Sequence, residues 1–201
     1  MNTSHDEFNW LTEFGPFYDV SCVSFVRSVA PTQALTRLGA NHTDIEPATF
    51  EELQERTMLC FDANGSSYVG ALQAPGWTVL IQLWVGSLAH SPSLLRSLSH
   101  ETEVVCVHRN LHASDYFVYA ANSEQTVWFD QLTPGTRSGS DPDRLVREMR
   151  QVGLDPEHNW DAPDIDDPFP RAFALAKKIT GVSFSRALLE LPLSGIEIRE
   201  G

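Results

Sequence analysis

Alternating apolar and polar positions predict the strands of this chain. The run YDVSCVSFVR (residues 18–27) alternates and is rich in β-branched and aromatic residues, which is typical of a strand. Successive strand residues point to opposite faces of a sheet, so Cys22 and Ser24 share one face and Val23 and Phe25 share the other. We therefore expect an early strand at this position.

Further segments have the same character. SYVGALQAPGWTVLIQLWVG predicts a hairpin, because the turn pair Pro75-Gly76 separates two strand-like runs. Asn122-Ser123 predicts a second tight turn, since asparagine tolerates the left-handed backbone that such turns require. Strands are also expected over residues 102–109, 115–121, 125–132 and 193–200.

Apolar residues three and four apart predict helices around these strands. SHDEFNWLTEFG begins with Ser4 and Glu7 at the spacing of a capping box, and Gly15-Pro16 is expected to end this first helix. In SGSDPDRLVREMRQVG we expect Asp141 as the N-cap and Pro142 at the first helical position. Other helices are expected over residues 30–40, 48–59, 91–98, 170–181 and 185–191.

Hairpin-like strands with helices before and after them predict an α+β fold around a largely antiparallel sheet, with two of the flanking helices C-terminal. We expect a single domain over residues 1–201, since about 150 residues make a typical domain. The stretch 154–168 is proline-rich and acidic and predicts a surface loop. Residues 169–201 are too few for a core of their own, so they are expected as helices docked on the sheet.

Charge limits the classes of partner. The net charge is -13, from 27 acidic and 14 basic side chains, which repels a nucleic-acid backbone. The same charge favours a basic protein partner, or it serves solubility alone. We find neither a signal peptide nor a stretch apolar enough for a membrane helix, and the odd number of cysteines, three, fits free thiols. These features favour a cytoplasmic protein.

The stretch EVVCVHRNLHASDYFVYA concentrates reactive residue types. Cys106 and His108 share one face of the expected strand, while Arg109 takes the other. Their backbone positions lie about 7 Å apart, which is poor for a thiol–imidazole hydrogen bond. We therefore expect no catalytic residue here and interpret Cys106 as a buried apolar side chain.

Metal binding finds weak support in the same region. His108 and His112 have the H-x-x-x-H spacing, but that spacing binds zinc only on a helix, and Arg109 stands where the glutamate of the motif would be. His90 and His100 could add ligands only if the fold brought them near. The acidic loop lacks the glycine and terminal glutamate of a calcium-binding loop. We expect neither a metal nor a cofactor.

A small-molecule site remains an alternative. TPGTRSGSDPD opens a helix and could receive an anion near Arg137, but the expected cap Asp141 carries a charge that opposes one. If the protein binds a small molecule or is an enzyme, we expect a pocket on the sheet that uses three polar residues: Arg109, Arg137 and His108.

Aromatic residues provide the candidates for a partner surface. Trp160 lies within the acidic loop, and it either anchors the loop to the body or contacts a partner. The candidate partner-binding residues are Trp160, Asp161, Asp164 and Asp166. On the strands, Tyr116 and Trp128 face the side opposite to that of their neighbours Phe117 and Phe129, so they are exposed unless helices cover both faces of the sheet.

The chain also resembles a known family. Four segments, APGWTVLIQL, LLRSLSHETEVVCVHRNLHASDYFVYA, VWFDQLTPGTRSGSDPDRL and ALAKKITGVSFSRALLE, are similar to an uncharacterised bacterial family of small acidic α+β proteins, a domain of unknown function. The chain departs from the family at His100-Glu101, where a glycine is commoner, and at Asn122-Ser123, where Asp-Gly is common. The matching positions are Trp77, Leu98, Ser99, Asn110, Phe117, Phe129, Arg137, Gly139, Asp141, Pro142, Thr180 and Gly181.

The resemblance covers roughly residues 18–198 and implies a bacterial, cytoplasmic, single-domain protein, but it supplies no activity. We therefore expect a non-enzymatic protein-interaction module, for example an immunity protein that neutralises a toxin or a component of a larger system. A small-molecule-binding protein or an enzyme is the alternative, because a fold class alone does not decide function.

Overall fold

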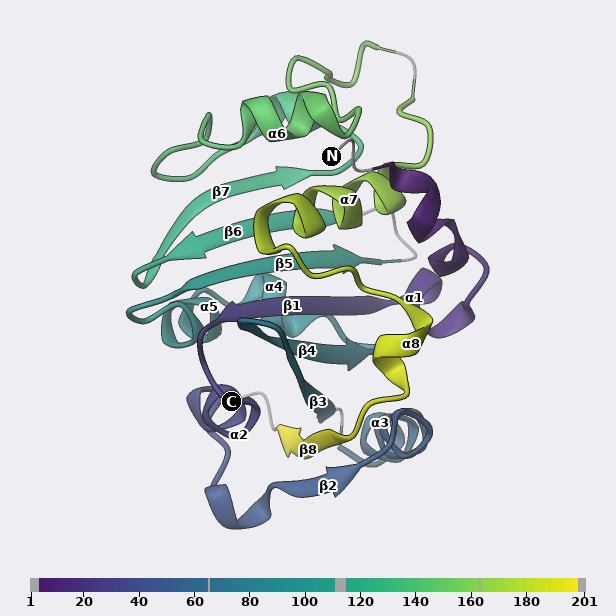
Figure 1. Cartoon of the computed structure of the whole chain (residues 1–201), viewed down its shortest axis with the longest axis vertical. Coiled ribbons are helices and arrows are strands. Elements are labelled where there is room, and N and C mark those ends of the chain that lie inside the picture. The colour runs from purple at the N-terminus through teal and green to yellow at the C-terminus, as the bar shows by residue number, and fades with distance from the viewer. Residues whose placement is uncertain (1–3, 65, 111–114, 163, 199–201) are drawn as a thin grey trace.

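One antiparallel sheet organises the molecule. The structure is a computed structural model that describes residues 4–64, 66–110, 115–162 and 164–198. Within these ranges eight strands pair in the order β2-β8-β3-β4-β1-β5-β6-β7 (Figure 1). Their bounds are β1 Ser21–Arg27, β2 Glu46–Ala48, β3 Ser67–Ala74, β4 Trp77–Leu83, β5 Glu103–Arg109, β6 Tyr116–Ala121, β7 Glu124–Asp130 and β8 Leu193–Ile198. The expected α+β class is confirmed.

Helices cover both faces of the sheet. The first face packs against η1 (His5–Leu11), α1 (Gly15–Asp19), α3 (Phe50–Asn64), α6 (Val146–Gln151), α7 (Pro168–Thr180) and α8 (Arg186–Leu189). The second face packs against α2 (Pro31–Arg37), α4 (Ser87–His90) and α5 (Pro92–Leu98). The short helices η2 (His42–Asp44) and η3 (Pro134–Thr136) lie in connections. In Figure 1, α7 crosses in front of the sheet and α4 and α5 lie behind it.

The two faces carry separate hydrophobic cores, as the alternation in β1 predicts. Val23 and Phe25 belong to the core of the first face, whereas Cys22 belongs to that of the second. Tyr116 and Trp128 on the second face are half-buried rather than exposed. The helical second layer therefore accounts for the outward aromatic residues of β6 and β7.

The predicted turns form as expected, and a side-chain cap lies at the start of α3. Gly76 turns between β3 and β4 with φ +75°, and Asn122 and Ser123 turn between β6 and β7 with φ 51° and 67°. At the start of α3, the Thr49 backbone N–H donates to Glu52 at 2.7 Å, and the Glu52 N–H donates to the Thr49 hydroxyl at 3.2 Å. This reciprocal pair is a capping box.

Two helix boundaries were predicted wrongly. Gly15-Pro16 begins α1 rather than ending a helix, because proline is well suited to a first helical turn. The first segment is the 3₁₀ helix η1, where Ser4 caps the N–H of Asp6 and not that of Glu7. Asp141 is not an N-cap: its N–H donates to the Thr126 carbonyl of β7, residues 142–145 form turns, and α6 begins only at Val146.

The C-terminal segment does more than dock on the sheet. α7 packs on β5 and η1, as a docked helix does. β8, however, lies between β3 and β2, with Val69 opposite Ile196 and Glu46 opposite Gly195. The last described strand is therefore an interior member of the sheet.

Candidate functional site

The three candidate ligand-binding residues do not converge. His108 faces the second side of the sheet, and Arg109, the next residue of β5, faces the first side beside Tyr18 and Phe169. Arg137 follows η3, beyond β7. A single pocket that uses all three side chains is therefore absent from the described part of the chain.

His108 is enclosed within the second layer. Its side chain is 1% exposed, and its ring lies 4.5 Å from the ring of His90 in α4 and 5.9 Å from that of Tyr116. Gly86 lies directly against the imidazole, so that a Cβ there would overlap the ring. Burial, followed by the charge of His90, lowers the pKa of His108 to about 4. At neutral pH the imidazole is therefore uncharged.

Two cysteines and a serine form a buried polar chain beside His108. The Ser24 hydroxyl donates to Cys106 Sγ at 3.1 Å, and Cys22 Sγ lies 3.6 Å from the same hydroxyl. All three side chains are fully buried. Hydrogen bonding to Cys22 and burial raise the pKa of Cys106 well above that of an ordinary thiol. Hydrogen bonding to Cys106 in turn lowers the pKa of Cys22, but both thiols are shielded from solvent, which does not suit a nucleophile.

Arg109 lines a small cavity on the first face. Its guanidinium lies 3.7 Å from the centre of the Tyr18 ring, and Nη1 donates to Asp115 Oδ2 at 2.6 Å. The cavity has a volume of about 340 Å³ and is also lined by Phe169 and Asn110. Burial raises the pKa of Asp115, although the Asn110 N–H and Arg109 act against this shift. The guanidinium of Arg109 thus already binds Asp115 and stacks on Tyr18.

Arg137 holds two loops together. Its Nε and Nη2 donate to Asp143 Oδ1 at 2.8 and 2.6 Å, and its Nη1 donates to the carbonyl of Pro156. The Gly135 N–H donates to the carbonyl of His158 at 2.7 Å beside it. Arg137 therefore fixes the start of the acidic loop rather than lining a cavity.

The acidic loop exposes its tryptophan. Trp160 is 71% exposed, the largest fraction of any large hydrophobic residue that the structure describes. Asp161, Asp164 and Asp166 around it are exposed as well. Of the two roles expected for Trp160, the structure does not support an anchor to the body, because the indole projects into solvent.

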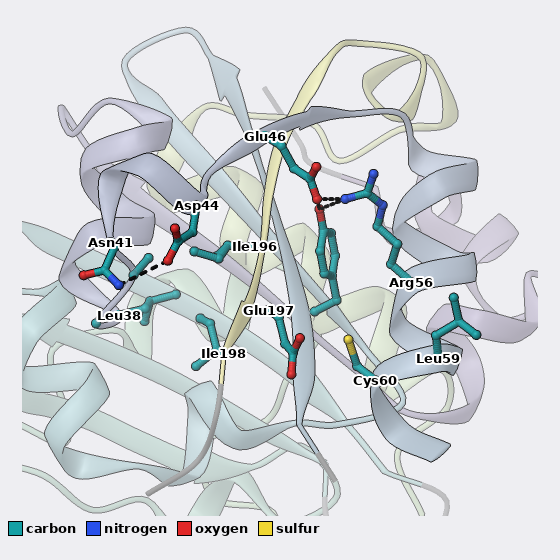
Figure 2. A pocket seen from close by; sticks show the side chains of 13 residues that line it. Leu38, Asn41, Asp44, Glu46, Arg56, Leu59, Cys60, Ile196, Glu197 and Ile198 are labelled. Carbon is teal, nitrogen blue, oxygen red and sulfur yellow. Dashed lines mark hydrogen bonds and ion pairs between the residues drawn. The ribbon is translucent and has the colours of Figure 1, made fainter. Parts of the chain in front are cut away.

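Another cavity lies at the opposite end of the sheet and was not predicted. It has a volume of about 880 Å³ and opens beside β8, between the end of α2 and the middle of α3 (Figure 2). We call it the edge cavity; its lining residues are Leu38, Gly39, Ala40, Asn41, Asp44, Glu46, Arg56, Leu59, Cys60, Tyr68, Ile196, Glu197 and Ile198.

Polar groups gather on the α3 side of the edge cavity. Arg56 forms an ion pair with Glu46, and its Nη1 donates to the Tyr68 hydroxyl at 3.0 Å (Figure 2). Burial raises the pKa of the Cys60 thiol, and the Glu197 carboxylate adds to this shift. On the other wall Asp44 accepts from the Asn41 amide at 3.1 Å. The cavity thus combines an acidic rim with an ordered arginine–tyrosine pair.

Sequence patterns gave no signal for this cavity. Its residues come from the segment after α2 and from η2, β2, α3 and β3, which follow one another in the chain, and from β8, which is far from them in sequence. The three-residue strand β2 was too short for a periodic pattern, and its pairing with β8 depends on the topology. Only the sheet order brings these segments together.

Metal ligands do not cluster within the described ranges. No group of three His, Cys, Asp or Glu side chains there has the geometry to hold a metal ion. His112, which could have extended the H-x-x-x-H pair, lies outside the described residues. No helix in the described ranges is long and apolar enough to cross a membrane.

The fold and its cavities define an α+β protein with one antiparallel sheet between two helical layers. The chain belongs to a family of unknown function, DUF6461, which matches residues 1–192. The match ends immediately before β8. It confirms the part of the resemblance that concerned a domain of unknown function. No curated protein and no solved structure matches the chain.

Proposed function

We propose that this protein is a non-enzymatic protein-interaction module that binds a basic partner through its acidic loop. The exposure of Trp160, at 71%, carries the proposal. A tryptophan in solvent forgoes the burial that a ring of its size normally gains, and tryptophan is enriched among the residues that dominate binding energy. The indole is therefore the expected centre of the contact.

The surrounding charge supports a basic partner. Residues 154–170 contain neither lysine nor arginine, and the side chains of Asp161, Asp164 and Asp166 are exposed in the same loop as the indole. Such an arrangement attracts a cationic surface over a distance of about 10 Å at moderate salt. Binding should therefore weaken as the salt concentration rises.

The loop is also held in place at both ends. Arg137 binds the carbonyl of Pro156, and Arg171 Nη1 donates to the carbonyl of Val152 at 3.1 Å. Arg171 Nε donates to the carbonyl of Asp166 at 2.6 Å. Loop ends that are fixed before binding leave less conformational entropy to be lost when a partner arrives.

The chemistry of the buried residues supports a non-enzymatic role. Cys106 is shielded and His108 is uncharged at neutral pH, and each lacks the exposure that a catalytic group needs. A bacterial cytoplasmic protein of this kind would serve as an immunity protein that neutralises a basic toxin, or as one component of a larger assembly. Its three free cysteines fit a reducing compartment.

A binding titration tests this proposal. Proteins encoded beside its gene are purified, and their affinity for the intact protein is measured by calorimetry. With the partner found, Trp160→Ala should weaken binding by about tenfold or more, whereas Leu191→Ala, a matched change of an exposed apolar residue, should leave it unchanged. If none of these proteins binds, or if both variants bind equally well, the proposal is wrong.

A small-molecule site at Arg109 is a second candidate. It rests on the cavity of about 340 Å³ that Arg109 and Asp115 line. The geometry favours it less, because the guanidinium already donates to Asp115 and stacks on Tyr18. Stabilisation of the wild-type protein, but not of Arg109→Lys, by members of a metabolite panel in a thermal shift experiment would support this candidate.

A further inference from the structure

The sheet is incomplete at one edge. β2 pairs with β8 only over Leu193–Gly195. Before Glu46 the chain turns away into η2, while β8 continues to Ile198 beside β3. The edge cavity lies where β2 would have continued, and both Ile196 and Ile198 line it. The space therefore has the position of a missing strand segment.

Both helical layers extend past this edge. α2 packs on β8 from the second face of the sheet, and α3 packs on it from the first. Leu38 stands on the wall that continues α2, and Leu59 and Cys60 stand on the wall formed by α3 (Figure 2). An extended chain in this cavity would lie in the plane of the sheet, with a helical layer on each side.

The two walls differ in chemistry. Ile196 and Ile198 point toward the second face, where they share a core with Leu38. Glu197 alternates with them and lies opposite Tyr68, on the side of Arg56 and Glu46. The wall on the second face is thus apolar apart from Asn41 and Asp44, and the wall on the first face is polar (Figure 2). An added strand alternates in the same way, so its side chains would meet each wall in turn.

We propose that the edge cavity binds an extended, basic segment of a partner protein, which adds to the sheet beside β8. Three carboxylates, from Asp44, Glu46 and Glu197, line the cavity against one guanidinium, that of Arg56, which Glu46 already pairs. The excess of negative charge around the cavity favours lysine or arginine in the segment. Ile196 and Ile198 favour apolar residues on the side of the segment that faces them. Backbone hydrogen bonds supply the part of the affinity that does not depend on the sequence of the segment.

A second copy of the chain is the less favourable occupant. Pairing two β8 edges would bring two sets of the same three carboxylates together, in molecules that each carry a net charge of -13. Like charges across an interface oppose association. The edge cavity and the Trp160 loop also lie at opposite ends of the molecule. The cavity lies at the β2–β8 edge of the sheet, and the loop that precedes α7 lies beyond the β7 edge (Figure 1). The two proposals are therefore independent.

Peptide selection tests this inference. A phage library of random dodecapeptides is selected on the full chain, and the enriched peptides are synthesised with a fluorescent label. We expect them to alternate apolar residues with lysine or arginine. Asp44→Lys should weaken their binding in fluorescence anisotropy by about tenfold or more, while the matched reversal Asp164→Lys in the acidic loop should leave it unchanged.

Backbone pairing has its own measurement. Binding of the peptide should slow hydrogen exchange at those residues of Ile196–Ile198 whose N–H groups face the cavity. Methylation of the amide nitrogens along one edge of the peptide should abolish binding, while methylation along the other edge is tolerated. If the peptide bound by charge attraction alone, the two methylated peptides would bind equally well.

Three outcomes overturn the inference. The first is a selection without enriched peptides. The second is a peptide whose affinity falls in Asp164→Lys or Trp160→Ala but not in Asp44→Lys, which would place binding on the acidic loop. The third is a dimer of the wild-type chain in sedimentation that Asp44→Lys alters, which would make a second copy the occupant. Failure of the acidic-loop proposal would change none of these readouts.

Discussion

The imidazole of His108 donates from Nδ1 to the backbone carbonyl of Ser21 across 3.0 Å, from β5 to the start of β1. Because a carbonyl can only accept, Nδ1 carries the proton. Nε2 is then the bare nitrogen, and it has no hydrogen-bond partner in the described part of the structure. Protonation would therefore place a positive charge on a buried atom without a partner.

The first prediction concerns pH. The pKa of His108 falls from 6.5 to about 4 on folding, so the unfolded chain takes up a proton first as the pH falls. Stability should then be greatest above about pH 6.5 and decline toward pH 4, by on the order of 3 kcal/mol, since each unit is worth about 1.4 kcal/mol. Urea unfolding across this range measures the decline.

Two variants assign that pH dependence. His108→Gln retains a donor for the Ser21 carbonyl but does not titrate, so its stability should vary much less between pH 6.5 and 4. His42→Gln changes an exposed histidine and should behave like the wild type. Equal slopes in all three proteins would show that another group causes the effect.

The second prediction concerns the Arg109–Asp115 ion pair. Its side chains are 16% and 3% exposed, so Arg109→Met would leave the Asp115 carboxylate buried without its cation. We expect a loss of about 2 kcal/mol in the free energy of unfolding, because removing one partner of a buried pair strands the other.

Controls separate the pair from general effects. Adding Asp115→Asn to Arg109→Met should recover part of the loss, since the stranded charge is then removed. Arg147→Met breaks an exposed pair, in which the arginine side chain is 83% exposed, and should cost less than about 0.5 kcal/mol. A larger loss in the double variant than in Arg109→Met would contradict this account.

The third prediction concerns Gly139. It has φ +125°, and a Cβ there would overlap the carbonyl oxygen of Thr126 on β7. Gly139→Ala should therefore separate the strand edge from the segment that pairs with it, at a cost above about 2 kcal/mol. Gly39→Ala is the matched control, because φ is +95° and nothing lies within 4 Å of the added carbon. Similar thermal unfolding of the two variants would refute the overlap as the cause.

The fourth prediction concerns thiol reactivity. Cys22 and Cys106 are fully buried, whereas Cys60 is half-buried at the edge cavity. In the native protein we expect Cys60 to react first with a thiol reagent, slowly because burial raises its pKa. Cys60→Ser should abolish this reaction, and all three thiols should react in denaturant. Fast labelling of Cys22 or Cys106 in the native protein would mean that the second layer opens readily.

Local sequence patterns predicted most of the fold. The strands β1 and β3 to β7 follow from alternation, and the turns at Pro75-Gly76 and Asn122-Ser123 follow from the backbone freedom of their residues. Boundaries failed where a tertiary contact took precedence over a local signal. Asp141 has a typical N-cap residue type, but it pairs with Thr126 on β7, turns occupy residues 142–145, and the helix begins only at Val146.

The candidate site was less predictable, because position in space depends on the sheet order. Alternation correctly placed His108 and Arg109 on opposite faces, which is the reason that they share no pocket. The sequence around Arg137 did not indicate that its guanidinium N–H groups would donate to Asp143 and Pro156. The edge cavity required the pairing of residue 46 with residue 195, and no local pattern encodes a contact of that sequence separation.

The position of β8 has a consequence for synthesis on the ribosome. β3 and β2 have no direct contact as neighbours in the sheet, because β8 lies between them. While residues 193–198 are still inside the exit tunnel, the outer edge of β3 has no strand to pair with. This half of the sheet can form only after that segment emerges, when Ile198 can pair with Ser67. Pairing over so long a separation in sequence is slow.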